Sequence, residues 1–283
     1  MRRIIVAAAV LFLICAADMP SRAAMVSMKP EKYARDPHGS YSMQISPKIK
    51  KKADKVHKAI RKSNKKHYWI KGKTTKELRA VLAYMSGRYL NYQVPGEWPD
   101  FGNVFRGTPG KYEVDLHPRL YRKLRKKDRY VKDIIKTAIR QMQIHTFWNE
   151  SDAVKSVNQW ICDRVDYDWK GYNDEEASVM WSAYQGLKYG RCVCEGYADI
   201  FQLFMNEIGI RAYRVSSWDH IWNVVVIDGE SEYVDVCWND GRGSYNWLLS
   251  KTFPDHNPAE KIEDNRYVTF KEKRVFYSKK KGY

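Results

Sequence analysis

The stretch Gly190–Ala198, which reads GRCVCEGYA, decides the fold of this 283-residue chain. It begins as a turn and runs directly into a segment in which apolar residues recur at helical spacing. Those residues are Tyr197, Ile200, Phe201, Phe204, Met205 and Ile208. Gly209 ends the pattern, because glycine readily adopts the left-handed conformation found just after a helix. The sequence therefore predicts a buried helix with Cys194 in its first turn.

Strand patterns follow this helix at residues 211–217, 221–227 and 232–238. Asp228 and Gly229 separate the last two strands, and this dipeptide is typical of a tight hairpin turn. A capped amphipathic helix is expected just upstream, beginning near Ser151. Helix, loop, buried helix and antiparallel meander in this order indicate an α+β fold rather than alternating βαβ units. We therefore expect the helix that carries Cys194 to pack on an antiparallel sheet.

The residues before this region, 68–145, are expected to form a helical lead-in. Thr74 and Glu77 match a capping box, and the helical stripe Leu78, Val81, Leu82 and Met85 follows them. A second amphipathic helix is indicated by one apolar face, formed by Val131, Ile134, Ile135, Ala138, Ile139 and Met142. Residues 93–112 are rich in Pro and Gly and predict a loop with short extended pieces.

The N-terminus has the pattern of a secretory signal peptide over residues 1–24. Arg2 and Arg3 supply the positive charge, and Ile4–Ala17 is an apolar segment too short to span a bilayer comfortably. Small residues precede a plausible cleavage point after Ala23. An uncleaved anchor is the alternative. The pattern predicts a chain that is secreted or associated with the cell envelope.

The net charge of +17 is unevenly distributed. Residues 150–240 contain seventeen Asp and Glu against seven Lys and Arg, whereas Lys48–Lys66 contains ten Lys and Arg against one Asp. We interpret residues 25–67 as a flexible basic arm that could turn helical through its lysine-rich run, and 256–283 as a basic C-terminal extension of the core. In an exported protein such an arm would contact an anionic cell wall or membrane surface, and nucleic acid is not an expected partner. A solvated face and an arm docked on the acidic core are the alternatives.

Three residues in this region form a candidate nucleophile, base and orienting group. Cys194 lies at a helix N-terminus, where unpaired N–H groups and partial positive charge favour a thiolate and can hold an oxyanion. His220 opens a predicted strand, and Asp235 lies on the strand expected to pair with it, ~5 Å away. Each residue alone has an ordinary structural explanation. In this order and context they indicate a Cys-His-Asp triad.

The motifs as a set resemble the transglutaminase-like superfamily, in particular secreted bacterial members. The resemblance rests on GRCVCEGYA at 190–198, on His220 followed by Trp222 and Asn223, and on YVDVCW at 233–238. It covers roughly 145–255, which we take as a catalytic domain over 146–255. It implies a papain-like α+β core that acts on protein or peptide substrates through a thioester, with no cofactor and no metal.

Two departures from the family pattern lie beside the triad. Cys237 stands where Thr is usual, and Asn239 separates Trp238 from Asp240. Neither change affects a triad residue.

The resemblance allows more than one function. Water resolving the thioester would make the protein a peptidase-like amide hydrolase, which we favour, whereas an amine would make it a protein-glutamine transamidase. A non-catalytic envelope-binding module of the same fold is the alternative from another class. Tyr184, Gln185 and Trp222 are candidates, by position only, for oxyanion or substrate contacts.

Cleavage of the signal peptide would leave four cysteines, and their states are open. A Cys192–Cys237 disulfide is compatible with export, because both should lie near the triad. Cys192, Cys194, His220 and Cys237 could instead hold zinc, although the short Cys-x-Cys spacing is uncommon for that metal.

Overall fold

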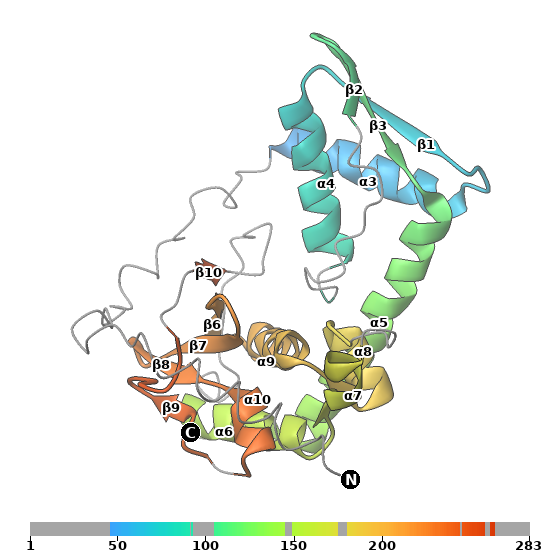
Figure 1. The fold of residues 1–283 in the computed structure, drawn as a ribbon. Coiled ribbons are helices and arrows are strands. Elements are labelled where there is room, and N and C mark those ends of the chain that lie inside the picture. Colours follow the sequence, from blue (N-terminus) through green and yellow to red (C-terminus); the bar gives the residue numbers. More distant parts are fainter. Residues whose placement is uncertain are drawn as a thin grey trace.

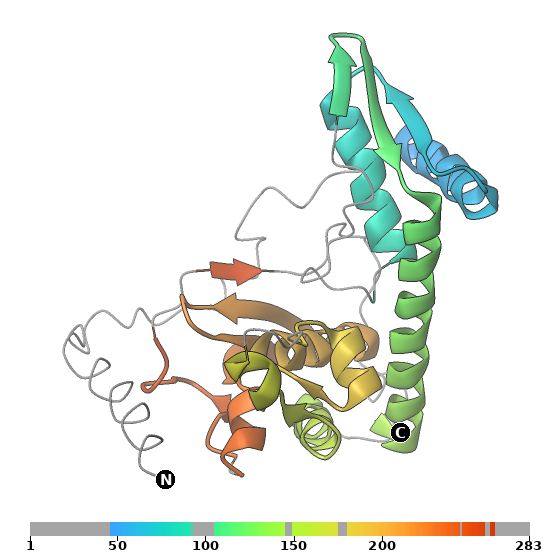
Figure 2. The same cartoon turned by 45° about the vertical axis from the view of Figure 1, so that its right-hand side comes forward.

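A computed structural model describes residues 46–90, 92, 105–144, 149–174, 180–243, 245–257 and 261–263. The long helix α5 (Pro118–Gln141) connects two packed units, one built from the residues before it and one from the residues after it (Figures 1 and 2). Each unit has its own cluster of buried apolar side chains. Within the described ranges, no helix is long and apolar enough to cross a bilayer. The predicted signal peptide lies outside these ranges.

The N-terminal unit places two helices against a small antiparallel sheet. Its elements are α3 (Pro47–Lys62), β1 (Tyr68–Gly72), α4 (Thr75–Tyr89), β2 (Phe105–Thr108) and β3 (Lys111–Leu116). The strand order is β1-β3-β2, and Ile70 pairs with Val114 at the centre of the β1–β3 ladder. The sequence predicted helices here and, over 93–112, a loop with short extended pieces. The sheet was missed because its strands are short, and because β2 lies within this Pro- and Gly-rich segment and β3 begins in it.

The expectation of a flexible arm through residue 67 is wrong for the described residues 46–67. Residues 47–62 form α3, which begins at the cap Ser46 and buries Ala53, Val56 and Ile60 in the N-terminal core. Its apolar positions are sparse but recur at helical spacing, so the many lysines occupy the outer face. Residues 25–45 of the proposed arm lie outside the described part of the chain.

Helix α4 begins where its sequence predicts. The Thr74 hydroxyl accepts a hydrogen bond from the Glu77 N–H at 3.0 Å. Glu77 does not complete the box, because its carboxylate instead accepts from the Lys73 N–H at 2.8 Å and from Lys52 Nζ of α3 at 2.6 Å. The expected stripe Leu78, Val81, Leu82 and Met85 is buried. The cap and the ion pair thus join α3, β1 and α4.

The C-terminal unit contains, in its described residues, a five-stranded antiparallel sheet in the order β10-β6-β7-β8-β9. The strands are β6 (Arg211–Ser216), β7 (Ile221–Ile227), β8 (Glu230–Val234), β9 (Leu248–Ser250) and β10 (Lys261–Glu263). The β7–β8 hairpin turns at Asp228 and Gly229, whose φ angles of 51° and 92° suit the predicted turn. The predicted third strand is wrong beyond Val234, because residues 236–241 form helix α10 (Val236–Gly241).

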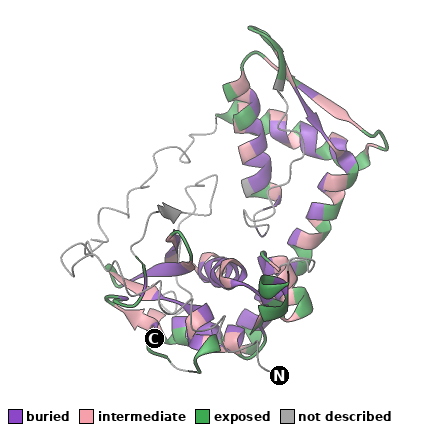
Figure 3. Cartoon of the chain, viewed as in Figure 1, coloured by how far each residue is buried: buried purple, intermediate pink, exposed green. Residues whose placement is uncertain are grey.

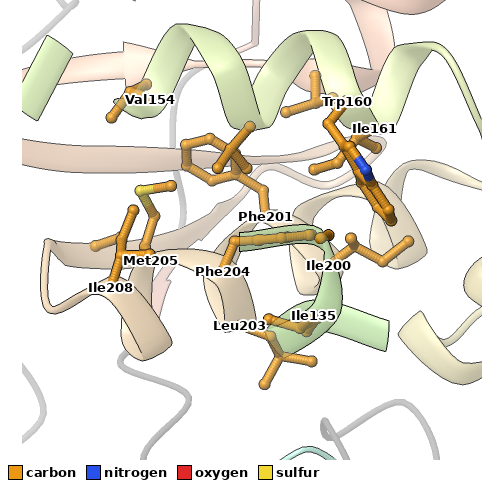
Figure 4. Close-up of a cluster of buried hydrophobic side chains, with 14 of the residues drawn as sticks. Ile135, Val154, Trp160, Ile161, Ile200, Phe201, Leu203, Phe204, Met205 and Ile208 are labelled. Atoms are coloured by element: carbon orange, nitrogen blue, oxygen red, sulfur yellow. The ribbon is translucent and has the colours of Figure 1, made fainter. Parts of the chain in front are cut away.

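Helix α9 (Cys194–Ile208) is the centre of this unit, as the apolar pattern predicted. It packs on β6 and β7 and against α5 and α6 (Glu150–Cys162), and it is buried along most of its length (Figure 3). Figure 4 shows its Ile200, Phe201 and Phe204 beside Trp160 and Ile161 of α6. Burying one such side chain fully contributes about 1.5–3 kcal/mol. The α+β class and the antiparallel sheet beneath this helix are confirmed.

An ion pair fixes the first turns of α9 to the sheet. Arg214 on β6 donates to Asp199 at 2.9 Å and to Glu195 at 3.2 Å, and Arg214 and Asp199 are both buried. Removing one partner of a buried pair leaves an uncompensated charge, which typically costs about 3–5 kcal/mol. The pair therefore constrains where Cys194 lies relative to the strands.

The C-terminal boundary at residue 255 is too short. His256 is buried in the unit, and Ile262 of β10 pairs with Val215 of β6 at the sheet edge. These residues belong to the core rather than to a basic extension. Residues 264–283 lie outside the described part of the chain.

Ile60→Ala should lower the free energy of unfolding by about 2–4 kcal/mol, because Ile60 is fully buried between α3 and the rest of the N-terminal core. Lys58→Ala, on the exposed face of the same helix, is the matched control and should change little. Urea denaturation followed by circular dichroism measures both. Equal stability of the two variants would restore the interpretation of this segment as a flexible basic arm.

Candidate active site

Cys194 is presented by a strand-turn-helix arrangement. β5 (Arg191–Cys192) pairs in parallel with β4 (Asp166–Tyr167), and α9 begins immediately afterwards with Val193 as its cap. The Val193 N–H donates to the Met180 carbonyl at 3.0 Å, which fixes the approach. The first N–H groups of a helix have no helical acceptor, which makes the Cys194 N–H a candidate donor to an oxyanion.

Gly196 of the motif and Gly186 just before it are explained by close packing on Cys192. A Cβ added at Gly196 would lie 2.5 Å from Cys192 Cβ and 2.6 Å from its Sγ, and one at Gly186 of α8 (Ala183–Tyr189) would lie 2.9 Å from that Sγ. Contacts this short do not occur between real side chains. The second thiol of the Cys-x-Cys pair is thus a buried packing residue beneath the helix start.

His220 and Asp235 meet across the end of the β7–β8 hairpin. Asn223 pairs with Val234, so the continuation of this register brings Asp235 opposite Trp222 and diagonal to His220. His220 Nε2 donates to Asp235 Oδ2 at 2.6 Å. Asp235 lies just beyond the strand rather than on it, where it caps α10 by accepting from the Trp238 N–H at 3.1 Å.

The pKa of His220 reflects both partners. Burial alone would lower it, but the charge and hydrogen bond of Asp235, followed by the hydrogen bond and charge of Cys194, raise it from 6.5 to about 10. With Nε2 committed to Asp235, Nδ1 is the ring nitrogen left for Cys194. The structure therefore brings all three predicted residues together, with the His220 imidazole between the Cys194 thiol and the Asp235 carboxylate.

Asp235 is a buried anion kept charged by its donors. Burial would raise the pKa of its carboxyl, but the charge and hydrogen bond of His220, then the hydrogen bond and charge of His256, lower it from 3.8 to about 2. Its contribution to stability is thus present above pH 3.8 and lost as the pH falls through about 2. His220 also stabilises the fold, but with the reverse pH dependence: its contribution is present below pH 6.5 and is lost as the pH rises through about 10.

His256 is a site residue that the sequence reasoning missed. Its Nε2 donates to the same Asp235 Oδ2 at 2.8 Å, and its ring packs against Trp238 at 4.0 Å and Phe253 at 4.5 Å between centroids. No local motif marks this histidine. The only available signal was its place shortly after the last predicted strand, in a segment interpreted as a basic extension.

Cys162, Cys192 and Cys237 differ from Cys194 in their surroundings. Burial raises the pKa of Cys162 to about 12 and raises those of Cys192 and Cys237 well above 9.0, with nearby acidic groups adding to the effect. All four described cysteines are free thiols, so the alternative of a Cys192–Cys237 disulfide does not hold here. Among the described residues, the set Cys192, Cys194, His220 and Cys237 does not bring its ligand atoms within 4.8 Å of one another, so the zinc alternative has no support in the geometry.

Of the three candidates named by position only, Tyr184 and Gln185 have structural roles. Tyr184 packs against Tyr130 of α5, with ring centroids 5.6 Å apart. Gln185 completes a capping box with Ser182 at the start of α8. Trp222 is buried and stacks beside His220 at 5.9 Å, so it is the one of the three that the structure brings to the triad.

Tyr167 lies beside Cys194 and was not among the site residues predicted from the sequence. Tyr167 on β4 pairs with Cys192 on β5, and Cys192 lies two residues before Cys194. Burial and then the charge of Cys194 raise its pKa. A protonated phenol beside the thiol is a possible hydrogen-bond donor to a reacting oxygen.

The unusual Asn239 has a clear role in the structure. It is buried, and its side chain holds Trp247 by accepting from that residue's N–H at 3.1 Å and donating to its carbonyl at 3.2 Å. The following Asp240 accepts from the Tyr197 hydroxyl of α9 at 2.6 Å. Both residues thereby brace α10, which Asp235 caps.

Comparison with known proteins finds similarity over the C-terminal unit. Residues 138–248, from the last turn of α5 to the start of β9, match the model of the transglutaminase-like superfamily. Kyphoscoliosis peptidase of Mus musculus is 22% identical over 138 residues, covering 41% of this chain and 21% of that protein. Its Homo sapiens counterpart is 23% identical over 159 residues, covering 49% and 22%. The matched region thus spans about a fifth of the length of these relatives.

Solved structures with partial likeness were also found. One described as a TGase has a TM-score of 0.34 and 16% identity, covering 47% of this chain and 43% of that chain. A candidate cysteine protease from Cytophaga hutchinsonii has a TM-score of 0.30 and 17% identity, covering 38% and 37%.

Cys194 should react with iodoacetamide near neutral pH before the other described cysteines, whose raised pKa values keep them protonated. His220→Ala should slow this labelling about 10-fold or more, because the thiolate loses its partner. Peptide mapping by mass spectrometry gives the site and rate, with His117→Ala as the control. Equal labelling rates in wild type and His220→Ala would remove His220 from thiol activation.

His256→Leu should lower kcat about 10-fold or more with KM little changed, because Asp235 loses a buried hydrogen bond worth about 1.5–3 kcal/mol. His256→Gln retains a donor and should recover much of the rate. Phe253→Leu disturbs the packing of the His256 ring but not its hydrogen bond, so it separates the two effects. A rate lost equally in all three variants would leave His256 with a packing role only.

Proposed function

We propose that this protein, whose residues 138–248 match the model of the transglutaminase-like superfamily, is a cysteine-dependent acyl-transfer enzyme that acts on amide bonds of proteins or peptides, with hydrolysis as its main reaction. The observation that supports it most is the His220 contact with both Asp235 and Cys194 at the first turn of α9. A purely structural role for His220 would explain its hydrogen bond to Asp235 but not its contact with a thiol at a helix N-terminus.

The first half-reaction forms a thioester. The Cys194 thiolate attacks the carbonyl carbon of the substrate, and the oxygen takes the electron pair as an oxyanion. The N–H of Cys194 in the first turn of α9 is the proposed backbone donor to that oxyanion, with the Tyr167 hydroxyl as a second donor. As the C–N bond breaks, His220 gives its proton to the leaving amine.

The second half-reaction releases the acyl group. His220, now neutral, takes a proton from water while the water oxygen attacks the thioester carbon. The C–S bond breaks, a carboxylic acid leaves, and the thiolate–imidazolium pair is restored. Asp235 keeps the imidazole in the orientation and tautomer that both proton transfers require.

Exposed aromatic side chains near the triad support a polymeric substrate. Trp169 packs on Tyr167 with centroids 4.5 Å apart, Trp181 follows the Met180 carbonyl that anchors Val193, and Trp218 precedes His220 by two residues. Trp169, Trp181 and Trp218 are 63%, 47% and 71% exposed. Solvent-exposed tryptophan rings around a reactive thiol are suited to binding the apolar side chains that flank the reacting amide of a substrate.

Export and a basic contact surface are part of the proposal. Residues 1–24 have the pattern of a signal peptide, and cleavage would leave Ala24 as the first residue, which the mass of the secreted protein would report. Nine of the ten basic residues of Lys48–Lys66 are exposed, while Lys52 pairs with Glu77. This face of α3 would bind an anionic cell wall or membrane surface in a salt-sensitive manner.

Purified protein incubated with glutamine-containing peptides should release cleaved or deamidated products without an added amine, because water can resolve the thioester. Mass spectrometry of products with and without a primary amine distinguishes hydrolysis from transamidation. Cys194→Ala is the control and should be inactive. Amine-adduct formation as the dominant product would favour the transamidase alternative. No turnover of any peptide in wild type, with Cys194 unreactive, would favour a binding module.

A further inference from the structure

We propose that His67, Asp115 and His117 form a binding site for a divalent transition-metal ion of the zinc class in the N-terminal unit. These residues are far from the triad in sequence and in the fold, and the proposed enzyme activity does not use them. They bring together two imidazoles and a carboxylate, the ligand types that zinc commonly takes in proteins.

The β1–β3 ladder places all three side chains on one face. Tyr68 pairs with Leu116 and Trp69 with Asp115, so the same register continues to His67 opposite His117. Asp115 and His117 are two residues apart and therefore point to the same side of their strand. The two imidazole rings lie with centroids 5.2 Å apart.

The ligand atoms already converge. One donor atom from each residue lies within 4.8 Å of the others. Asp115 is buried, and its Oδ2 holds His67 Nδ1 while its Oδ1 accepts from the Tyr68 N–H at 3.2 Å. His117 caps α5 without a side-chain hydrogen bond, and neither of its ring nitrogens has such a partner among the described residues.

A metal ion would replace a proton in this cluster. His67 Nδ1 and Asp115 Oδ2 are joined by a hydrogen bond, and an ion bound between them would displace the proton of that bond to solvent as both atoms become ligands. His117 would supply the third ligand from its unused nitrogen. A solvent molecule would fill the fourth position, since the site has three protein ligands and His67 is partly exposed.

The local charge sets the expected strength. The positive end of the α5 dipole and the exposed Lys65 and Lys66 repel a cation. Among the three ligands, only the carboxylate of Asp115 offsets this repulsion with a negative charge. We therefore expect moderate affinity rather than that of a four-cysteine site. A bound ion would connect the start of β1 to the start of α5, and thus tie the N-terminal sheet to the helix that joins the two units.

A rival cluster must be separated in the test. His220, Asp235 and His256 also bring three ligand atoms within 4.8 Å. Both imidazoles there already share one buried carboxylate oxygen, but Cys194 could add a thiolate to an ion. The experiment therefore uses the full chain without a histidine tag, in a Cys194→Ala, His220→Ala background.

Titration calorimetry with zinc should give one binding site in this background, and Co²⁺ should give the d–d absorption of a site with His and carboxylate ligands. Adding His117→Ala should weaken zinc binding by ~10-fold or more, because even the loss of an outer partner of a metal ligand commonly costs that much. Adding His256→Leu, the matched control, should leave binding unchanged. Melting curves in EDTA check that both variants fold.

Zinc should raise the melting temperature of the background protein but not that of its His117→Ala variant. Absence of binding in the background, or equal binding after His117→Ala, would overturn the proposal. Loss of binding in the His256→Leu variant would assign the ion to the rival cluster and overturn it as well.

Discussion

The buried carboxylate of Asp235 is the constraint on which the arrangement of the site depends. A charged group that is 1% exposed must be surrounded by donors, because an unpaired buried charge is costly. Its three donors come from different places: His220 before β7, His256 after β9, and the N–H of Trp238 in α10. Satisfying one anion thus fixes the positions of three separate segments, and one of these carries the imidazole that faces Cys194.

The position of Cys194, on the other side of the site, is determined by packing. Gly186 and Gly196 allow α8 and α9 to close on Cys192, and the Arg214 pair with Asp199 holds α9 to the sheet. The thiol therefore comes from a helix whose position is determined by the core, and the imidazole from strands whose position is determined by the same core. Positioning of this kind is what a charged nucleophile and its base require, since small displacements weaken proton transfer.

The sequence was most informative where residue type and local geometry are tightly coupled. Apolar spacing and Gly209 located α9, the Asp228–Gly229 turn located the β7–β8 hairpin, and the motifs that resemble a known family named Cys194, His220 and Asp235. It was least informative where tertiary packing decides. The apolar residues of α3 are outnumbered by lysines, so burial of Ile60 could not be read from composition. His256 reaches Asp235 only because the chain after β9 returns to the sheet, and no local pattern specifies that return.

The central claim is that Cys194, activated by His220, accepts an acyl group. The most direct measurement is the intact mass of the protein quenched in acid shortly after mixing with p-nitrophenyl acetate at neutral pH. The account predicts one added acetyl group, mapped to Cys194, that forms rapidly in wild type and slowly in His220→Ala. An acetyl group found elsewhere, or formed at the same rate in both proteins, would contradict it.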